Sequence, residues 1–447
     1  MGPDDKAPHA MSEIEDPHDT PTVRSRSMAP GVPSVLQIRG FRQFWIASLI
    51  SNCGSWLQTV AAGYLVYHLT HSPGMVGALA LVSRGPAFLL STTGGRLADR
   101  FDRRMVGRWT FALQGIAAAG MAVMSLLGLL SVPVIFVFTF ALGVGFALGL
   151  PAVLALVPAL VPVEHFEQAV ALNAAGVNVA RLAGPALGGI LLGLVGATWC
   201  FGLNAFSFLA LVFVLGWVQV RPSGPRAALV STRRALAFAW RDPAIHRLLF
   251  GMAVFAALAA PIQELAPVIA HTLGSGAIGL GLLLGAMGGG ALVGAWALDR
   301  AQAHGLTRDR ALTVATLLFA VMMVGLAVAP TLGLGLVAMA LCGAFWIWMF
   351  IVANTSVQLR APRSMVGRML GLYQLAVIGP IAVGSLLAGL WAEVVGIRWS
   401  FVTCAVLLGI WGLWTLRTPV PEIDDGRAPE PDEVAPGARA GHVDPVG

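Results

Sequence analysis

The chain has 447 residues, of which 57% are hydrophobic and only 11% are charged, and its mean hydropathy is +0.78. Soluble globular proteins carry roughly 25% charged residues, so this composition excludes a soluble domain and indicates an integral protein of the lipid bilayer. The net charge of +6 comes from arginines scattered over short polar segments, without an aromatic-basic module. We therefore expect no nucleic-acid partner.

Apolar runs follow one another along most of the chain. A transmembrane helix requires about 20 mostly apolar residues. Twelve runs of that kind occur, at about 44–69, 74–93, 105–130, 132–160, 169–194, 198–220, 246–271, 275–299, 311–329, 332–359, 367–395 and 397–417. They predict an all-α membrane protein with twelve transmembrane helices.

The arginines predict the topology. With the N-terminus in the cytoplasm, every arginine except Arg84, Arg181 and Arg398 falls in a terminal tail or a cytoplasmic loop. This distribution follows the positive-inside rule and places both termini in the cytoplasm. Residues 1–40 and 419–447 are polar and rich in proline, so we expect them to be disordered cytoplasmic tails.

An internal repeat divides the apolar region into two halves. The Ala-Asp-Arg of 98–100 has a counterpart in the Leu-Asp-Arg of 298–300, and further pairs recur at a similar spacing. We expect six helices in 41–220 and six in 246–418. The intervening segment, 221–245, has apolar residues near helical spacing and predicts an amphipathic helix on the cytoplasmic surface, although a plain linker remains an alternative.

The stretch Gly94–Arg104, GGRLADRFDRR, stands out between two apolar runs. Its charges cannot lie in hydrocarbon, so we expect a short loop in water that joins two membrane helices, the first of which ends at Asp99. The order of its residues is more specific than that of a basic loop that only sets topology. The residues of interest are Gly95, Asp99, Arg100, Arg103 and Arg104.

This stretch resembles the helix 2–3 signature of the major facilitator superfamily, except that Asp102 stands where the family has glycine. The sequences Phe41–Trp45, Arg181–Gly189 and Trp240–Pro243 resemble the branch of bacterial enterobactin exporters and macrolide efflux proteins. The resemblance implies a monomer in the bacterial inner membrane. It also implies two parallel six-helix halves with a substrate site between them.

The resemblance further implies that Asp99 locks the closed cytoplasmic side. A carboxylate gains from the dipole at the N-terminus of a neighbouring helix, by about 0.3–1 kcal/mol. By resemblance, this neighbour is the helix that starts near Met365. Together with Gly95 and the three arginines, Asp99 would form a gating latch.

The fifth apolar run carries a second motif, which resembles one found in antiporters of this superfamily. Proline bends a helix, and glycines let another helix approach closely. A pliable helix between the two halves would suit a rocking movement, although ordinary small-residue packing gives the same pattern. The motif comprises Arg181, Gly184, Pro185, Gly188 and Gly189.

Ionisable side chains in hydrocarbon are costly and are functional candidates. Glu264 is the only carboxylate well inside an apolar run, which makes it the candidate for proton coupling, unless it is solvated near the outer surface or paired. Arg84 and Arg181 must face a cavity or pair, and either could attract an anionic substrate. Candidates for the substrate cavity are Asn52, Gln58, Arg84, Asn173 and Asn178; Trp346 and Trp348 could stack on an aromatic substrate.

The sequence contains no phosphate-binding Gly-x4-Gly-Lys loop, no His-Glu-x-x-His and no nucleophile elbow, so we expect neither an ATP-driven pump nor an enzyme. Its four cysteines lack metal-site spacing, and we expect no metal or cofactor. The predicted function is proton-coupled export of a small organic compound, drug-like or siderophore-like, by alternating access. An importer or lysolipid flippase of the same fold, or a non-transporting membrane receptor, remains an alternative.

Overall fold

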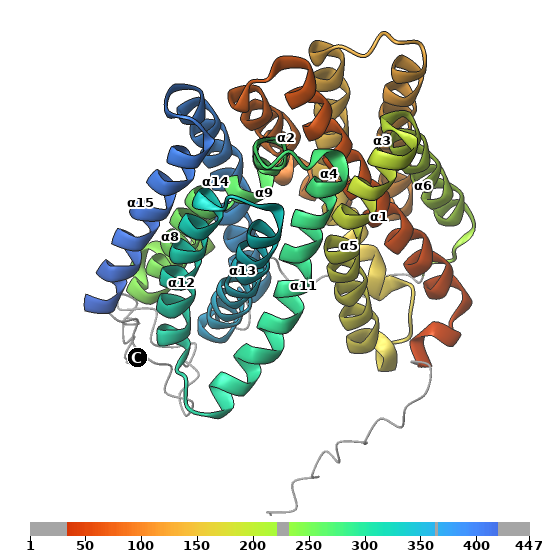
Figure 1. Ribbon diagram of the computed structural model, residues 1–447. Helices are drawn as coiled ribbons and strands as arrows, with labels where there is room; N and C mark the ends of the chain where they lie inside the picture. The colour runs from red at the N-terminus through yellow and green to blue at the C-terminus, as the bar shows by residue number, and fades with distance from the viewer. Residues whose placement is uncertain (1–33, 221–231, 363–364, 419–447) are drawn as a thin grey trace, which may run out of the picture.

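The computed structural model describes residues 34–220, 232–362 and 365–418. The predicted tails lie almost wholly outside these ranges. The described residues form helices and contain no strand. Figure 1 shows two helical bundles side by side, one built from the first half of the chain and one from the second.

The N-terminal half consists of six long helices and two 3₁₀ turns. Glycine or histidine in a left-handed or otherwise positive-φ conformation ends two of these helices, at His71 and Gly196. The elements are η1 (Ser34–Gln37), α1 (Arg39–Thr70), α2 (Pro73–Arg100), α3 (Arg103–Leu126), α4 (Val132–Ala159), η2 (Val163–His165), α5 (Phe166–Val195) and α6 (Ala197–Trp217).

A short helix, α7 (Thr232–Arg241), precedes the C-terminal half and lies within the segment predicted to hold an amphipathic helix. The predicted seventh membrane helix is divided into three pieces at Pro261 and Pro267, because proline lacks the N–H that continues a helix. The half comprises α8 (Pro243–Ala259), α9 (Pro261–Glu264), α10 (Ala266–Thr272), α11 (Gly276–Ala303), α12 (Arg308–Val328), α13 (Leu332–Arg360), α14 (Val366–Val395) and α15 (Ile397–Arg417).

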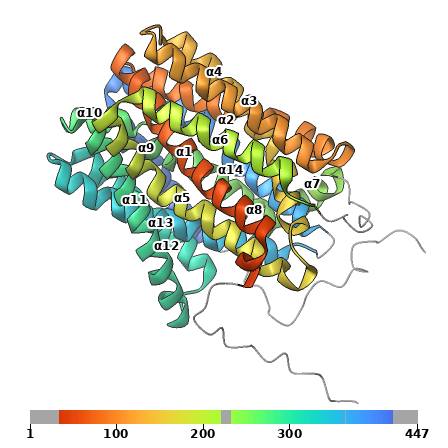
Figure 2. The same cartoon turned by 90° about the vertical axis from the view of Figure 1, so that its right-hand side faces the viewer.

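Eleven segments of the described chain are long and apolar enough to cross a membrane. They do not include α1, which has 32 residues and carries several serines, Asn52 and Gln58 along its length. This helix nevertheless packs between α5 and α6, as Figure 2 shows. With α1 as the twelfth spanning helix, the predicted twelve-helix architecture is confirmed.

The two halves repeat one packing scheme. In the N-terminal half α2 packs against α4 and α3 against α6, and in the C-terminal half α11 packs against α13 and α12 against α15. The halves meet through two further pairs, α2 with α14 and α5 with α11. The internal repeat in the sequence therefore corresponds to two equivalent bundles that share a four-helix interface.

The stretch Gly94–Arg104 is mostly helical, so the expected loop is shorter than predicted, whereas the predicted helix end at Asp99 is within one residue of the observed end. Helix α2 continues through this stretch to Arg100, and only Phe101 and Asp102 connect it to α3. The helix continues because Gly94 packs against α4, where an added Cβ would lie 2.6 Å from the carbonyl oxygen of Ala147. The charged residues thus extend a membrane helix past its apolar part.

The two ends of the molecule differ in their side chains. At one end α2 meets α3 and α11 meets α12, and Arg100, Arg103, Arg300 and Arg308 lie at these junctions. We call this the arginine end. At the opposite end α1 meets α2 and α10 meets α11; we call it the histidine end, after the histidines at those two junctions.

Candidate functional site between the two halves

The two halves are packed backbone to backbone toward the histidine end. A Cβ on Gly189 of α5 would lie 2.2 Å from the Cα of Gly281 in α11, and a Cβ on Gly77 of α2 would lie 2.4 Å from the carbonyl oxygen of Ser385 in α14. The Ser385 side chain is fully buried, and among the described residues its hydroxyl has no hydrogen-bond partner. This end is therefore closed.

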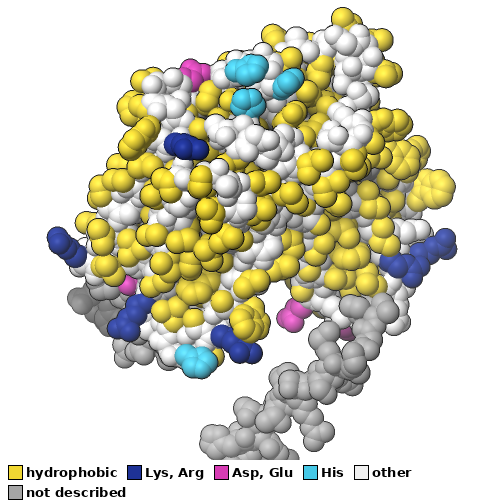
Figure 3. Space-filling view, in the orientation of Figure 1, with side chains coloured by type: hydrophobic (Ala, Val, Ile, Leu, Met, Phe, Trp, Pro, Cys, Tyr) yellow, Lys and Arg dark blue, Asp and Glu magenta, His cyan; other side chains and the backbone are white. Residues whose placement is uncertain are grey.

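The halves separate toward the arginine end. A Cβ on Gly95 of α2, or on Gly367 or Gly371 of α14, would meet nothing within 4 Å. Along α5, Leu182 still touches Gly288 of α11, but the exposed Asn178, one turn closer to the arginine end on the same helix face, marks where the contact ends. Figure 3 shows the surface hollowed at this end between the two halves.

An ion pair joins the two halves within this interface. Arg84 of α2 donates from Nε and Nη2 to Oε1 of Glu264, the last residue of α9, over 3.1 and 2.5 Å. The two side chains are only 27% and 11% exposed. The pair therefore brings together two residues that the sequence singled out separately, and Glu264 adopts the paired alternative.

A second cation crosses the interface close by. The guanidinium carbon of Arg181 in α5 lies 5.9 Å from the ring centroid of Phe350 in α13. Arg181 is also close enough to Arg84 for their charges to interact. Tyr373 of α14 donates its hydroxyl to the Phe350 carbonyl oxygen at 3.4 Å and holds this segment in place. The sequence analysis missed Phe350 and Tyr373, because aromatic residues inside an apolar helix carry no signal of which way they face.

The antiporter-like motif lies where α5 is packed between two helices. Cβ atoms on Gly184 and Gly188 would collide with Trp56 and Leu57 of α1, whereas Gly189 faces α11. Helix α5 runs without a break through Pro185, which is buried. The motif therefore holds α5 close to both its own half and the opposite half.

The other cavity candidates occupy different environments. Gln58 is 3% exposed, accepts a hydrogen bond from Asn204 at 2.5 Å and donates to the sulfur of Met121, so it lies inside the N-terminal half. Asn52 and Asn173 are half-buried, and Asn52 donates to the carbonyl of its own helix at 2.7 Å. Asn178 is exposed on the face of α5 where the contact with α11 ends. Trp346 and Trp348 are both buried in the C-terminal half, where stacking on a substrate is blocked.

The residues of the predicted latch surround the junction of α2 and α3. Asp102 caps α3 by accepting from the backbone N–H groups of Arg104 and Met105 at 2.7 and 3.4 Å. The side chain of Arg103 donates to the Ala155 carbonyl at 3.3 Å, and that of Arg104 to the Val218 carbonyl at 2.9 Å. These bonds tie the start of α3 to the ends of α4 and α6. Asp99 and Arg100 are exposed at the end of α2.

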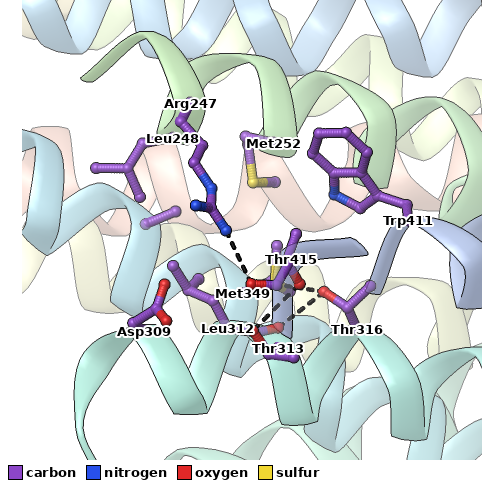
Figure 4. A pocket seen from close by; sticks show the side chains of 12 residues that line it. Arg247, Leu248, Met252, Asp309, Leu312, Thr313, Thr316, Met349, Trp411 and Thr415 are labelled. Carbon is purple, nitrogen blue, oxygen red and sulfur yellow. Dashed lines mark hydrogen bonds between the residues drawn. The ribbon is translucent and has the colours of Figure 1, made fainter. Parts of the chain in front are cut away.

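A cavity of about 40 Å³ lies inside the C-terminal half, between α8, α12, α13 and α15 (Figure 4). Arg247 donates across it to the Thr415 carbonyl at 3.1 Å, and the Thr313 and Thr415 hydroxyls are 3.2 Å apart. Pockets for organic ligands measure about 300–1,000 Å³, so this cavity has room for water but not for a transported molecule. In the described ranges, no three His, Cys, Asp or Glu side chains are placed to hold a metal ion.

Solved structures with a similar fold are membrane transporters. A bacterial homologue of the human lysosomal transporter Spinster, in an inward-facing and unoccupied conformation, superimposes with a TM-score of 0.68 at 15% identity, over 87% of this chain and 97% of that one. The nucleoside transporter NupG gives a TM-score of 0.61 at 15% identity, over 85% of this chain and 99% of that one. Two six-helix halves around a hollow open at one end define a major facilitator transporter.

The sequence comparison narrows this class. The family model described as transmembrane secretion effector matches residues 30–439. The enterobactin exporter EntS of Salmonella choleraesuis is 31% identical over 356 residues, which cover 78% of this chain and 84% of that protein, and EntS of Escherichia coli strain UTI89 is 30% identical over 354 residues. The chain belongs to the transmembrane secretion effector family of the major facilitator superfamily. It is a multi-pass membrane transporter and not an enzyme.

Proposed function

We propose that this protein exports a small organic compound, drug-like or siderophore-like, across the bacterial inner membrane by alternating access, in exchange for protons. The observation that carries the proposal is the ion pair between Arg84 and Glu264, because it joins the two halves through a group that a proton can neutralise. The enterobactin exporters among the relatives support the direction of transport.

The orientation follows from charge. By the positive-inside rule, the arginine end faces the cytoplasm and the histidine end faces the periplasm. The hollow then opens to the cytoplasm, and the molecule is in the state that loads a substrate for export. Asp99 and its neighbouring arginines would form the latch that closes this side after the halves have rocked.

The ion pair suggests how proton movement is coupled to export. An anionic group on the substrate competes with Glu264 for Arg84, so loading weakens the bond that holds the halves together. When the halves part on the periplasmic side, the freed carboxylate takes up a proton. The return to the inward-facing state re-forms the pair only after Glu264 has lost that proton to the cytoplasm, which gives antiport.

The side chains beside the ion pair suggest the chemistry of the substrate. Arg84 and Arg181 provide two guanidinium groups at the interface, and the Phe350 ring lies against the second. Guanidinium groups bind carboxylates and other planar anions in a bidentate way and also stack on aromatic faces. A compound that carries both an anionic group and an aromatic ring, such as a catecholate, fits this combination.

Everted membrane vesicles provide the test. After respiration has acidified the interior, a catecholate siderophore added outside should collapse the pH gradient with the wild-type protein, because the compound enters as protons leave. Glu264→Gln should abolish this collapse, since an amide cannot carry the proton. The matched control Glu167→Gln removes an exposed carboxylate at the start of α5 and should behave as wild type.

Two outcomes would contradict the proposal. If the gradient collapses equally with Glu264→Gln, the proton is carried elsewhere and the ion pair is structural. If siderophores, macrolides and cationic dyes all leave the gradient unchanged with a correctly folded wild-type protein, proton-coupled export itself is excluded for these classes of compound.

A further inference from the structure

At the histidine end, three histidines and two tyrosines form a cluster that crosses the interface between the halves. Tyr67 and His71, at the end of α1, lie with ring centroids 5.2 and 6.0 Å from that of His271 in α10. His68 lies 6.4 Å from His71 and 5.9 Å from Tyr64, on which it stacks. We call these five residues the histidine cluster. The cyan side chains of three histidines lie together at this end in Figure 3.

The three imidazoles are exposed to the solvent at this end of the molecule. The charged side chain that faces the adjoining turn is Glu393 of α14, which accepts hydrogen bonds from the Ser72 hydroxyl and from the Gly74 backbone N–H. Glu264, seven residues before His271 in the chain, forms its ion pair with Arg84. Tyr64 and Tyr67 are the remaining titratable groups in contact with the imidazoles.

The backbone of the cluster is held in an uncommon conformation. His71 has φ 52° and ψ 22°, and no other non-glycine residue in the described chain has a positive φ. Such a conformation persists only where the surroundings hold it, and it is concentrated at functional sites. His68 is in the last turn of α1 and His271 in the last turn of α10, where the helix dipole favours a positive charge.

We propose that His68, His71 and His271 form a proton-binding site that opens the histidine end of the transporter. Neutral imidazoles pack against one another and against Tyr67 across the closed interface. Two imidazolium ions about 6 Å apart on opposite halves repel each other, so protonation favours separation of the halves. By linkage, the open state binds protons more tightly than the closed state.

This proposal rests on the alternating access of the proposed function, but it does not require Glu264 to carry the transported proton. Histidine is the side chain whose unperturbed charge changes between pH 5 and 8. In the proposed orientation the site faces the periplasm, so an acidic periplasm would open the protein outward. Proton binding at this site would therefore act before any proton reaches the ion pair of Arg84 and Glu264.

Distance measurements between the two halves provide the test. Spin labels on Leu127→Cys, after α3, and Val328→Cys, at the end of α12, sit on opposite halves at the histidine end, where the side chains are 60% and 62% exposed. Cys53, which is half-buried whereas the other three cysteines are buried, is replaced by alanine. In lipid nanodiscs without substrate, lowering the pH from about 8 to about 5.5 should lengthen the distance, because this range spans the charge change of histidine side chains.

The variants assign this response to the histidine cluster. The triple variant His68→Gln, His71→Asn, His271→Gln should show no change with pH; asparagine is chosen at position 71 because it tolerates the left-handed conformation. His271→Gln alone removes the charge on the C-terminal side and should reduce the response by at least half. Glu393→Gln and Glu264→Gln should keep it, with monodisperse elution confirming that each variant is folded.

A wild-type distance that stays constant between these pH values would overturn the proposal, as would a triple variant that responds like the wild type. Neither result bears on whether siderophores collapse a pH gradient in vesicles. Conversely, a protein that fails the vesicle assay can still open at low pH. The two proposals therefore fail separately.

Discussion

Single glycines determine how closely the two halves approach. Gly189 and Gly281 bring α5 and α11 into backbone contact, and Gly77 does the same for α2 against α14. Membrane helices lack a hydrophobic force that drives them together, so such close contacts supply much of the attraction between them. The closed histidine end therefore depends on the absence of side chains at a few positions.

This dependence predicts the effect of adding one methyl group. Gly189→Ala would place a carbon 2.2 Å from the Gly281 Cα, and the overlap should disfavour the closed histidine end by about 1–3 kcal/mol. We expect the rate at which everted vesicles take up the catecholate siderophore to fall at least about fivefold. Gly202→Ala on α6, where a Cβ would meet nothing within 4 Å, is the matched control and should leave uptake unchanged. Normal uptake by Gly189→Ala would mean that the two helices need not touch during transport.

At the scale of residues, the sequence identified several members of the interface but not their relations. Arg84, Arg181 and Glu264 could be selected because charge is rare in apolar runs. The pairing of Arg84 with Glu264 depends on the rotation of α2 and α9 about their axes. This rotation cannot be deduced from a single sequence. The histidine cluster was missed for the same reason: His271 is 200 residues away from His71, and nothing in the sequence shows that the ends of α1 and α10 meet.

At the scale of elements, the junction between α2 and α3 explains how the chain departs from the family signature. The family has glycine where this chain has Asp102, and a glycine cannot cap a helix with a side chain. Asp102 instead accepts hydrogen bonds from the backbone N–H groups of Arg104 and Met105 in α3. The loop is therefore defined by an N-cap as well as by its short length.

The cap can be tested by hydrogen exchange. Asp102→Ala should lower the local stability of the first turn of α3 by about 1 kcal/mol, which corresponds to roughly fivefold faster amide exchange there. Asp102→Asn keeps a side-chain acceptor and should exchange at nearly the wild-type rate. Equal exchange in the alanine variant and the wild type would show that Arg103 and Arg104, through their bonds to neighbouring helices, suffice to hold the turn.

Helix positions were largely predictable, because a membrane requires long apolar runs and polar residues interrupt them. The residues at which helices end were less predictable. Apolarity ended near residue 93, whereas α2 continues to Arg100, since a helix does not stop where the bilayer does. The division of the seventh run into α8, α9 and α10 could have been read from Pro261 and Pro267.

At the scale of the whole molecule, the arrangement has one closed and one open end, and this asymmetry predicts chemical accessibility. A membrane-impermeant maleimide should label Asn178→Cys in everted vesicles, because the hollow opens to the arginine end, and should spare it in right-side-out vesicles. Leu127→Cys should show the opposite pattern. Labelling of Asn178→Cys only from the periplasmic side would reverse the proposed orientation.

The sequence predicted twelve helices in two halves, and the structure has that architecture. It could not predict which end is closed, because under the proposed alternating access the same sequence supports states closed at either end. The contact of Gly77 with Ser385 belongs to the arrangement in which the histidine end is closed. The pattern of small residues on α2, α5, α11 and α14 indicates that these helices approach closely but not when they do so.

The unsatisfied hydroxyl of Ser385 has a consequence for the balance between the closed and the parted arrangement of α2 and α14. A buried hydroxyl without a partner raises the energy of the state that contains it by about 1–3 kcal/mol, and water would satisfy it once α2 and α14 part. Relative to the arrangement with α2 and α14 apart, the arrangement with the closed histidine end is correspondingly less populated, by about 5- to 150-fold. A hydrogen-bond partner for the Ser385 hydroxyl would stabilise the closed arrangement and make the parting of α2 and α14 less favourable.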